Sequence, residues 1–478
     1  MFSGEGPEQK FPRESLPGHR HSSSMRIPNV GTFISRRTWL RAGTVLVGGA
    51  FARGVSALAR EVAPHPLRPS DLPDALPALN FHHPLDTQLA SMKGSSDALV
   101  AKKYMILHDE ALHQYETLKL TATNDLRVLT ATSDFVLKPG TEPAYFSKVF
   151  DKLPIKPIEH SKDFYDYAPD PDPKVTAFWV DFANLQLGGG VFGHGFVQEE
   201  IMCCEVPELA NAAALSPGLR TRSPGKEVLA GSPTPVILMG VHRVIEFYSD
   251  RPGHPYGTDE FRALDIHRPQ DYIRRLNPAV QFNVLAMAAP HLPDRTPEQQ
   301  FGRDTIHDLF NTFVAGFTLA AESAKAEGRH ATVNTGKIGS GDFNNNSNVV
   351  YVLQGLAAEL VGVNLRFWGY ADWEVDLAGR YYAAIRQKVD FGTTTVAQVL
   401  EVAHRILAAA LVEDLLPKEN RLEANLYGEP NASYQLRTST DLQHWVEGDK
   451  VTLSRVPAAV SVPAPSGGGP VFLRADAL

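Results

Sequence analysis

The feature that most constrains this chain is an apolar run that ends in a polar corner and a glycine loop. Residues 177–180 are apolar and predict a buried strand, and Asp181 and Asn184 lie where that strand ends. The glycines at 188–190 remove every side chain from the following loop, so its backbone can adopt positive φ and approach a ligand closely. Residues 198–205 predict a short helix that starts with two adjacent carboxylates. Ligand binding and acid–base chemistry are therefore expected in one short segment.

This ordered set of residues resembles a signature of the poly(ADP-ribose) glycohydrolase family. The shared residues are Val-Asp-Phe-Ala-Asn at 180–184, the three glycines at 188–190 and, seven residues later, Gln-Glu-Glu at 198–200. In that family the catalytic domain is a macrodomain-like α/β fold that hydrolyses the ribose–ribose glycosidic bond. The resemblance covers roughly residues 177–400, and it implies a hydrolase of the glycosidase class, acting in carbohydrate metabolism.

A second glycine-rich loop, at 334–343, follows a short predicted strand and precedes a predicted helix at 349–361. A glycine turn between a strand and a helix places free N–H groups and the helix dipole beside a diphosphate. The loop resembles the phosphate loop of the glycohydrolase family, whose pattern is Thr-Gly-Asn-Trp-Gly-Cys-Gly-x-Phe. Lys337 and Ile338 replace the Asn-Trp pair and Ser340 replaces the Cys. Lys337 would offer a cation for phosphate.

The chemistry is expected from the carboxylate pair. A glycosidic bond breaks through an oxocarbenium-like transition state, which needs an acid for the leaving oxygen and a base for water. Adjacent residues on a helix point about 100° apart, so Glu199 and Glu200 cannot flank the bond from opposite sides, and one carboxyl group must serve both steps. By resemblance, Glu200 protonates the departing ribose oxygen and then deprotonates water, while Glu199 positions the scissile ribose. The residues alone also allow two solvated glutamates in a first helical turn.

The resemblance also implies which side chains hold the ligand. Asp181 and Asn184 would bind the adenine and nearby ribose hydroxyls, respectively. Tyr370, at the end of the last predicted strand, would stack on the adenine. The alternatives are a helix or turn cap for Asp181 and an ordinary core aromatic for Tyr370.

An aromatic residue is expected to cover the scissile ribose from the segment after the strand at 235–240. Phe247, Tyr248 and Tyr256 compete for this place, and Tyr248 is preferred. No spacing indicates a metal, and the chemistry needs no cofactor. The expected substrate-binding residues are Asp181, Asn184, Gly188, Gly189, Gly190, Gln198, Tyr248, Gly339, Ser340, Gly341, Phe343 and Tyr370.

The first 59 residues predict a disordered lead followed by an export signal. Arg36 and Arg37 precede an apolar run at 42–52 and an Ala-Leu-Ala site at 57–59, which looks like a twin-arginine signal. The apolar run is too short to span a membrane. A bacterial protein exported to the periplasm or the medium is therefore expected, and a basic amphipathic helix is the alternative. The prolines of residues 60–80 predict a linker.

Beyond the linker, strands that alternate with helices predict an α/β fold, namely a macrodomain-like mixed sheet flanked by helices. We expect a glycohydrolase-like catalytic region at 81–416. Within it, residues 81–170 would form a helical accessory part and residues 171–400 the macrodomain-like core.

Two long helical segments and a terminal module complete the expected organisation. Residues 296–327 predict one helix, and residues 373–416 are expected to be helical. Past Pro417, alternating apolar residues separated by turns predict a small β-sandwich-like module at 418–478. This module resembles C-terminal modules of exported bacterial proteins and would serve as a spacer or attachment.

Charge and cysteine content limit the partners. The 478-residue chain has a formal charge of -8, yet residues 1–59 hold eight Lys and Arg against three Asp and Glu, so the remainder is strongly acidic. An acidic body disfavours a broad surface for duplex nucleic acid. Cys203 and Cys204 are adjacent, where a mutual disulfide would be strained, so they are expected to be small apolar residues of a helix.

Three functions remain open from the sequence. The leading one is an exported hydrolase of poly(ADP-ribose), with ADP-ribosylated side chains as other substrates. The second is a module that binds ADP-ribose without turning it over, although such a module would not need Glu199 and Glu200. The third is a surface interaction protein built around the C-terminal module. No sequence feature indicates an oligomeric state.

Overall fold

A computed structural model describes most of the chain beyond residue 82. The described residues are 83–120, 127–130, 142–215, 218–223, 231–248, 255–418, 421–428, 431–440, 444–454, 457–463 and 472–478. The expected lead, export signal and linker lie outside them. Within the described ranges, no helix is long and apolar enough to cross a bilayer.

The N-terminal region combines helices with two short strands. Its elements are α1 (His83–Met92), α2 (Ala98–Met105), the π-helical η1 (Ile106–Leu112), α3 (His113–Thr117), β1 (Arg127–Thr130), the 3-10 turn η3 (Ala144–Ser147) and β2 (Glu159–Ser161). The four helical segments up to Thr117 fit the expected accessory layer. However, β1 and β2 form the two edges of the main sheet, so this region is also part of the α/β fold.

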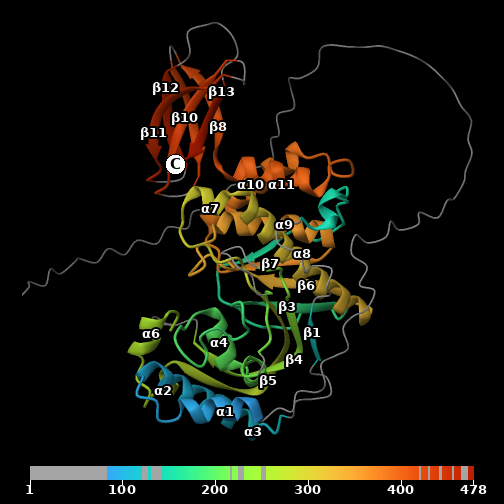
Figure 1. The fold of residues 1–478 in the computed structure, drawn as a ribbon, viewed down its shortest axis with the longest axis vertical. Coiled ribbons are helices and arrows are strands. Elements are labelled where there is room, and N and C mark those ends of the chain that lie inside the picture. The colour runs from blue at the N-terminus through green and yellow to red at the C-terminus, as the bar shows by residue number, and fades with distance from the viewer. Residues whose placement is uncertain are drawn as a thin grey trace, which may run out of the picture. The chain divides into compact units, whose positions relative to one another are not determined.

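The main sheet has seven strands in the order β1-β4-β5-β3-β6-β7-β2 (Figure 1). Its other strands are β3 (Val175–Phe182), β4 (Val236–Phe247), β5 (Ile273–Met287), β6 (His330–Thr335) and β7 (Asn364–Trp368). The five strands from β5 to β2 are parallel, whereas β4 pairs antiparallel with both of its neighbours, β1 and β5. The sheet is therefore mixed and flanked by helices, as predicted for a macrodomain-like fold.

The helices cover the sheet on both faces (Figure 1). They are α4 (Gln198–Glu205), α5 (Pro207–Ala213), α6 (Thr258–Ala263), η4 (Pro269–Asp271), α7 (Pro297–Phe301), α8 (Arg303–Ala326), α9 (Ser347–Val361), α10 (Asp372–Lys388) and α11 (Val396–Leu407).

Each face of the sheet has its own hydrophobic core. In β3 successive side chains alternate between faces, so Val180 packs with the core of α8 to α11, whereas Trp179 packs with the core of α1 to α5. The strand therefore reads as continuously apolar because both of its faces are buried. Asp181 is on the same face as Trp179, below α4.

Three expected boundaries were wrong. The helix expected at 296–327 is interrupted at Gly302, whose ψ of 147° ends α7 before α8 begins. The segments before and after Gly240 form one strand, β4, with a register shift between Leu238 and Val241. The helical segment expected to reach residue 416 ends at Leu407.

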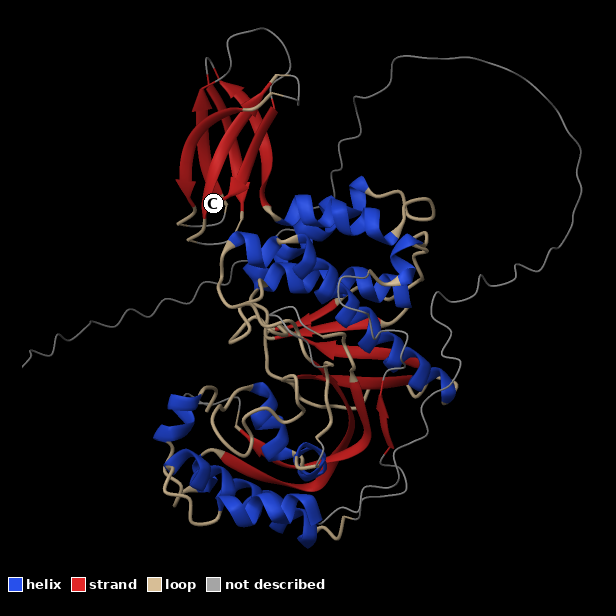
Figure 2. Cartoon of the chain, viewed as in Figure 1, coloured by secondary structure: helices blue, strands red, loops and turns tan. Residues whose placement is uncertain are grey.

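The C-terminal region is an all-β sheet of six antiparallel strands (Figure 2). Its strands are β8 (Ala409–Lys418), β9 (Arg421–Tyr427), β10 (Ser433–Ser439), β11 (Val446–Thr452), β12 (Ala458–Pro463) and β13 (Phe472–Ala477). A small core of its own, which includes Leu426, Leu436 and Val462, holds it together. The predicted small β module is present, but it starts at β8 rather than at residue 418.

Candidate functional site

The site begins where β3 ends and α4 starts. The side chain of Gln198, the first residue of α4, bridges back to the strand: its Oε1 accepts from Phe182 N at 2.8 Å and its Nε2 donates to Val180 O at 3.2 Å. These bonds fix the start of α4 against the end of β3. The next two residues, Glu199 and Glu200, are held in the same junction.

Both carboxylates are buried and bound by backbone N–H groups of the first glycine loop. Glu199 accepts from Asn184 N at 2.9 Å and from Gly188 N at 2.6 Å. Glu200 accepts from Gly190 N at 2.8 Å and, with its other oxygen, from Val197 N at 2.9 Å. Since the last bond caps α4, Glu200 fixes the start of its own helix.

The glycines at 188–190 are required by this arrangement. A Cβ on Gly189 would lie 2.4 Å from a Glu199 oxygen and 2.7 Å from a Glu200 oxygen, and a Cβ on Gly190 would lie 1.4 Å from His194 O. The expectation that these glycines offer N–H groups to phosphate was wrong, because the N–H groups of Gly188 and Gly190 already bind the carboxylates, and that of Gly189 donates to Gln186 O.

A third carboxyl group, that of Asp181, lies close to this pair. Asp181 is fully buried, and among the described residues neither of its oxygens has a hydrogen-bond partner. Burial raises its pKa to about 8, and Glu200 nearby adds to the rise. Burial, together with Asp181 and Glu200, also raises the pKa of Glu199 well above its usual range, although two backbone N–H donors oppose this. The surroundings of Asp181 and Glu199 therefore favour the protonated form of these two carboxyl groups.

The second glycine loop faces the carboxylates across a cavity of about 400 Å³. Glu199 and Glu200 line one side, together with Asn184. The loop from Lys337 to Phe343 lines the other, including Gly339, Ser340, Gly341 and Phe343. The structure thus brings together the two segments that the sequence singled out, which are more than a hundred residues apart.

Arg295 binds the second glycine loop from outside the loop, and some of the loop's backbone N–H groups remain available as donors. Arg295 donates to Ser340 O at 3.3 Å and to Gly341 O at 3.2 Å. Within the described ranges, the N–H groups of Gly341, Asp342 and Phe343 make no hydrogen bond to the protein. Gly341 has open space around the position of a Cβ. These donors suit an anionic oxygen, as expected for a loop before the helix α9.

Lys337 is not a free cation. Its ammonium lies 2.6 Å from a carboxylate oxygen of Glu374, and it is about one-third exposed. Glu374 also accepts from Ala371 N at 2.8 Å, which fixes it at the start of α10. Lys337 therefore brings little net charge to the cavity.

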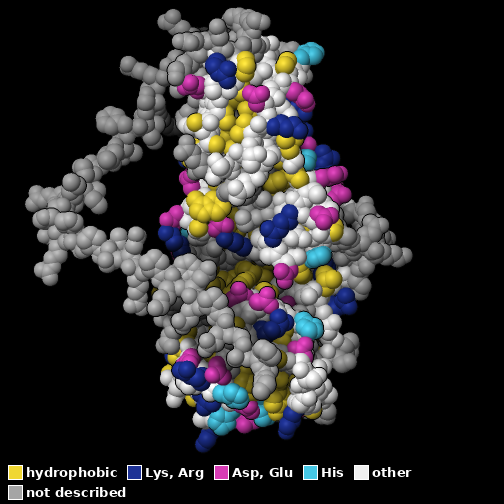
Figure 3. Space-filling view, turned by 90° about the vertical axis from the view of Figure 1, so that its left-hand side faces the viewer, with side chains coloured by type: hydrophobic (Ala, Val, Ile, Leu, Met, Phe, Trp, Pro, Cys, Tyr) yellow, Lys and Arg dark blue, Asp and Glu magenta, His cyan; other side chains and the backbone are white. Residues whose placement is uncertain are grey.

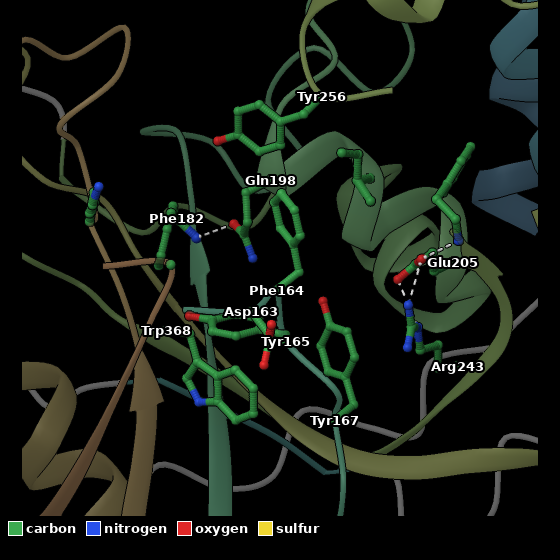
Figure 4. Close-up of a pocket in the computed structure, with 14 residues that line it drawn as sticks. Asp163, Phe164, Tyr165, Tyr167, Phe182, Gln198, Glu205, Arg243, Tyr256 and Trp368 are labelled. Atoms are coloured by element: carbon green, nitrogen blue, oxygen red, sulfur yellow. Dashed lines mark hydrogen bonds and ion pairs between the residues drawn. The ribbon is translucent and has the colours of Figure 1, made fainter. Parts of the chain in front are cut away.

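A second cavity, of about 330 Å³, adjoins the first and is largely aromatic (Figure 4). Gln198 and Lys337 line both cavities. At the far end from Gln198, Arg243 and Glu205 form a buried ion pair at 2.8 Å. The aromatic residues that line this second cavity are Phe164, Tyr165, Tyr167, Phe182, Phe247, Tyr256 and Trp368. The walls suit a flat ring, and the amide of Gln198 can supply a polar contact.

Two expected aromatic positions were wrong. Tyr370 is 1% exposed, stacks edge-on against Tyr351 and Phe367, and donates to Ser347 O at 3.2 Å, so it is a core residue. Gly369, with φ of 75°, turns the chain after β7. Tyr256 lines both cavities, whereas Tyr248 lines neither.

Of the residues that the structure places at the site, sequence reasoning gave Tyr256 only as an alternative to Tyr248 and missed Lys103. Tyr256 follows a segment with no periodic pattern, so only its aromatic character singled it out. Lys103, on α2, is fully buried and donates to Gly190 O. The only signal for Lys103 was a charged residue within an otherwise apolar helical pattern.

Charged side chains of both signs are mixed on one face of this protein. On the face shown in Figure 3, Lys and Arg side chains are interspersed with Asp and Glu rather than gathered. Among the described residues, no group of three or more His, Cys, Asp or Glu side chains is placed to hold a metal ion. Cys203 and Cys204 are both buried and free.

Part of this chain matches a known protein family. Residues 172–376 match the model of a family described as poly(ADP-ribose) glycohydrolase (PARG), macro domain fold. Among solved structures, the chain is similar to a poly(ADP-ribose) glycohydrolase from Deinococcus radiodurans in complex with ADP-ribose, at 15% identity over 49% of this chain and 75% of that chain, with a TM-score of 0.26. Another crystal form of that complex is similar at 14% identity over 50% of this chain and 77% of that chain, with a TM-score of 0.27. No curated protein matches.

Proposed function

Since residues 172–376 belong to the poly(ADP-ribose) glycohydrolase family, we propose that this protein hydrolyses ribose–ribose O-glycosidic bonds in poly(ADP-ribose) and releases ADP-ribose. The observation that carries the proposal is the first cavity, in which Glu199 and Glu200 stand opposite the N–H donors of the second glycine loop. A carboxylate pair and an anion-binding loop around one cavity match a substrate that has a diphosphate next to a glycosidic bond.

Glu200 would carry both proton transfers. Its two oxygens are fixed by Gly190 N and Val197 N, and each keeps a second lone pair for a proton. It would protonate the departing ribose oxygen as the glycosidic bond breaks, and then take a proton from the attacking water. A rigid carboxyl group favours this, because both steps need the same atom at the same place.

Glu199 would orient the scissile ribose. Burial raises the pKa of Glu199, which favours a protonated carboxyl group that could donate a hydrogen bond to one ribose hydroxyl and accept one from another. Asn184 is exposed at the edge of the same cavity and would bind ribose hydroxyls. Asp181 is buried near Glu199 and would act mainly by raising the pKa of Glu199.

The phosphate groups would bind the second glycine loop, and the adenine would enter the aromatic cavity. The free N–H groups of Gly341, Asp342 and Phe343 provide donors for the diphosphate. A ring in the second cavity would lie among Phe182, Tyr256 and Trp368, where aromatic contacts are favourable. Adenine binding therefore moves from Tyr370 to this cavity.

The test is release of ADP-ribose from automodified polymer, with Glu200→Gln as the critical variant. Because the amide keeps the shape of the side chain but cannot exchange the proton, turnover should fall by roughly 10² to 10⁴ while binding of free ADP-ribose is retained. Glu199→Gln should cost less. A wild-type protein that binds ADP-ribose without releasing it would support the binding-module alternative instead, and release only from ADP-ribosylated side chains would change the substrate.

Export by the twin-arginine route is a separate proposal, supported by the sequence at 36–59. Replacement of Arg36 and Arg37 by lysine should abolish accumulation outside the cytoplasm, since the paired arginines are the recognised feature. Fractionation of cells that express a tagged chain would measure it. Normal export of the double variant would rule out this route.

A further inference from the structure

We propose that Lys103, on α2 of the N-terminal region, is a positioning residue for the acid–base carboxylate, because it holds the glycine loop that binds Glu200. The inference rests on the proposed function. Lys103 is fully buried, and its ammonium donates to Gly190 O at 2.6 Å and to Gly193 O at 2.9 Å. An element outside the matched family region thereby reaches the centre of the site.

The link to Glu200 runs through one residue. Gly190 accepts from Lys103 with its carbonyl oxygen, and its own N–H donates to Glu200 Oε1 at 2.8 Å. The chain folds so tightly here that His194 O occupies the place of a Gly190 side chain. Gly190 therefore has little room to adjust, and a shift of its carbonyl would move the donor on which the Glu200 carboxylate rests.

The burial of this ammonium needs a reason. No carboxylate in the described part of the chain forms an ion pair with Lys103, whose ammonium instead donates to the two carbonyl oxygens. A buried charge without an ion pair is costly, and an apolar residue would pack against α4 at less cost. Burial lowers the pKa of Lys103, and Cys204 and Glu200 nearby oppose that change. A charged ammonium at this place gives charge-assisted hydrogen bonds to both carbonyl oxygens of the glycine loop.

The neighbouring lysine holds another wall of the site. Lys102 donates to the carbonyl oxygens of Phe261, Arg262 and Leu264, at the end of α6. The helix α6 starts directly after Gly257, which is next to the cavity residue Tyr256. Two consecutive lysines on α2 therefore fix two segments that border the cavities, one with the carboxylates and one with an aromatic wall.

The experiment compares Lys103→Met with wild type in kcat, KM and affinity for free ADP-ribose. Methionine keeps the volume but cannot bind the carbonyls, so kcat should fall roughly 10- to 100-fold, as expected for a misplaced catalytic group. KM and the Kd of ADP-ribose should stay within about threefold. Lys103→Gln, which keeps one donor, should lie between the two. Lys93→Met, at an exposed position near α2, is the matched control and should behave as wild type.

Hydrogen exchange separates this inference from the proposed function. In Lys103→Met and Lys103→Gln, peptides that cover 186–196 should exchange faster, whereas peptides of β6 should not change. This holds even if the wild type releases no ADP-ribose, an outcome that would reject the proposed function alone. Unchanged exchange in this loop, or wild-type kcat in a folded Lys103→Gln protein, would overturn the positioning role. A uniform loss of stability with equal changes in kcat and KM would also overturn it.

Discussion

The two glycine loops of this protein are both rich in glycine, but their N–H groups have different partners. The first, at 188–190, gives N–H groups to the protein's own carboxylates, Glu199 and Glu200. The second, at 336–343, is braced from outside by Arg295, and within the described part of the chain the N–H groups of Gly341, Asp342 and Phe343 have no protein acceptor. The first loop therefore holds the two carboxylates to which we assign the proposed chemistry, whereas the second loop keeps N–H groups that a ligand could bind.

This difference teaches that glycine content alone does not identify a phosphate loop. Glycine permits close approach, but the approaching group can be a side chain of the same chain. In the first loop the close contacts of Gly189 are two carboxylates, whereas in the second loop Gly341 has open space beside it. Substitutions at these two glycines should therefore have different consequences, which the following predictions use.

The largest effect is expected from Gly189→Ala. The new Cβ would lie 2.4 Å and 2.7 Å from oxygens of Glu199 and Glu200, so both carboxylates must move. Turnover on polymer should fall by about 10² or more, since a shift of about 1 Å in a reacting group has this cost. The affinity for ADP-ribose should change less than kcat. Gly379→Ala, in α10 with open space around it, is the control and should keep full activity. If affinity and kcat fell equally, the first loop would serve ligand binding as much as the carboxylates, and the proposed difference between the two loops would be wrong.

A smaller effect is expected from Gly341→Val. No atom lies within 4 Å of its Cβ position and its φ is not positive, so the variant should fold normally. The branched side chain would, however, stand among the N–H donors proposed to meet phosphate. The affinity for ADP-ribose should fall at least about tenfold, or about 1.4 kcal/mol. Calorimetry on the folded variant gives the value, and unchanged affinity would show that the second loop does not bind the diphosphate.

The smallest effect is expected in stability, from Asp181→Asn. The folded state holds the Asp181 proton up to a pKa of about 8, above the usual value of 3.8. The unfolded state loses that proton near pH 4, so wild-type stability falls as the pH rises from about 4 to about 8. The variant lacks this loss. Its Tm relative to wild type should therefore rise by a few degrees between pH 4 and pH 8.

The control for this measurement is Asp151→Asn, at an exposed carboxylate. Its Tm difference from wild type should be flat over the same range. A flat difference for Asp181→Asn as well would mean that Asp181 is ionised in the folded state, and that the carboxyl cluster near the first loop is less strongly coupled than its burial indicates.

Much of the fold could be predicted from sequence because its central elements have strong local signals. The apolar run of β3 and the helix α4 were predicted closely, and so was the strand–loop–helix unit around the second glycine loop. The errors arose where a single glycine decides whether a helix or a strand ends or continues. Gly302 breaks a pattern that is apolar on both sides, and Gly240 lies within a strand that continues through a bulge.

The site was predictable in its residues but not in all of its contacts. The carboxylates, Asn184 and the loop from Gly339 to Phe343 come together as expected. Sequence could not show that Tyr370 turns into the core, because the direction depends on the φ of Gly369. It also could not pair Lys103 with Gly190, since such a contact between distant segments has no local pattern.

The edge strand β2 also has a consequence for the timing of folding during synthesis. Its Glu159 pairs with Arg366 of β7, 207 residues later in the chain. At roughly 5 to 20 residues per second, the ribosome needs about 10 to 40 s to make the partner strand after β2 has been made. Until then one edge of the sheet cannot close. In a nascent chain of this protein, β2 therefore stays without its partner strand for many seconds, and the sheet is complete only after β7 has been synthesised.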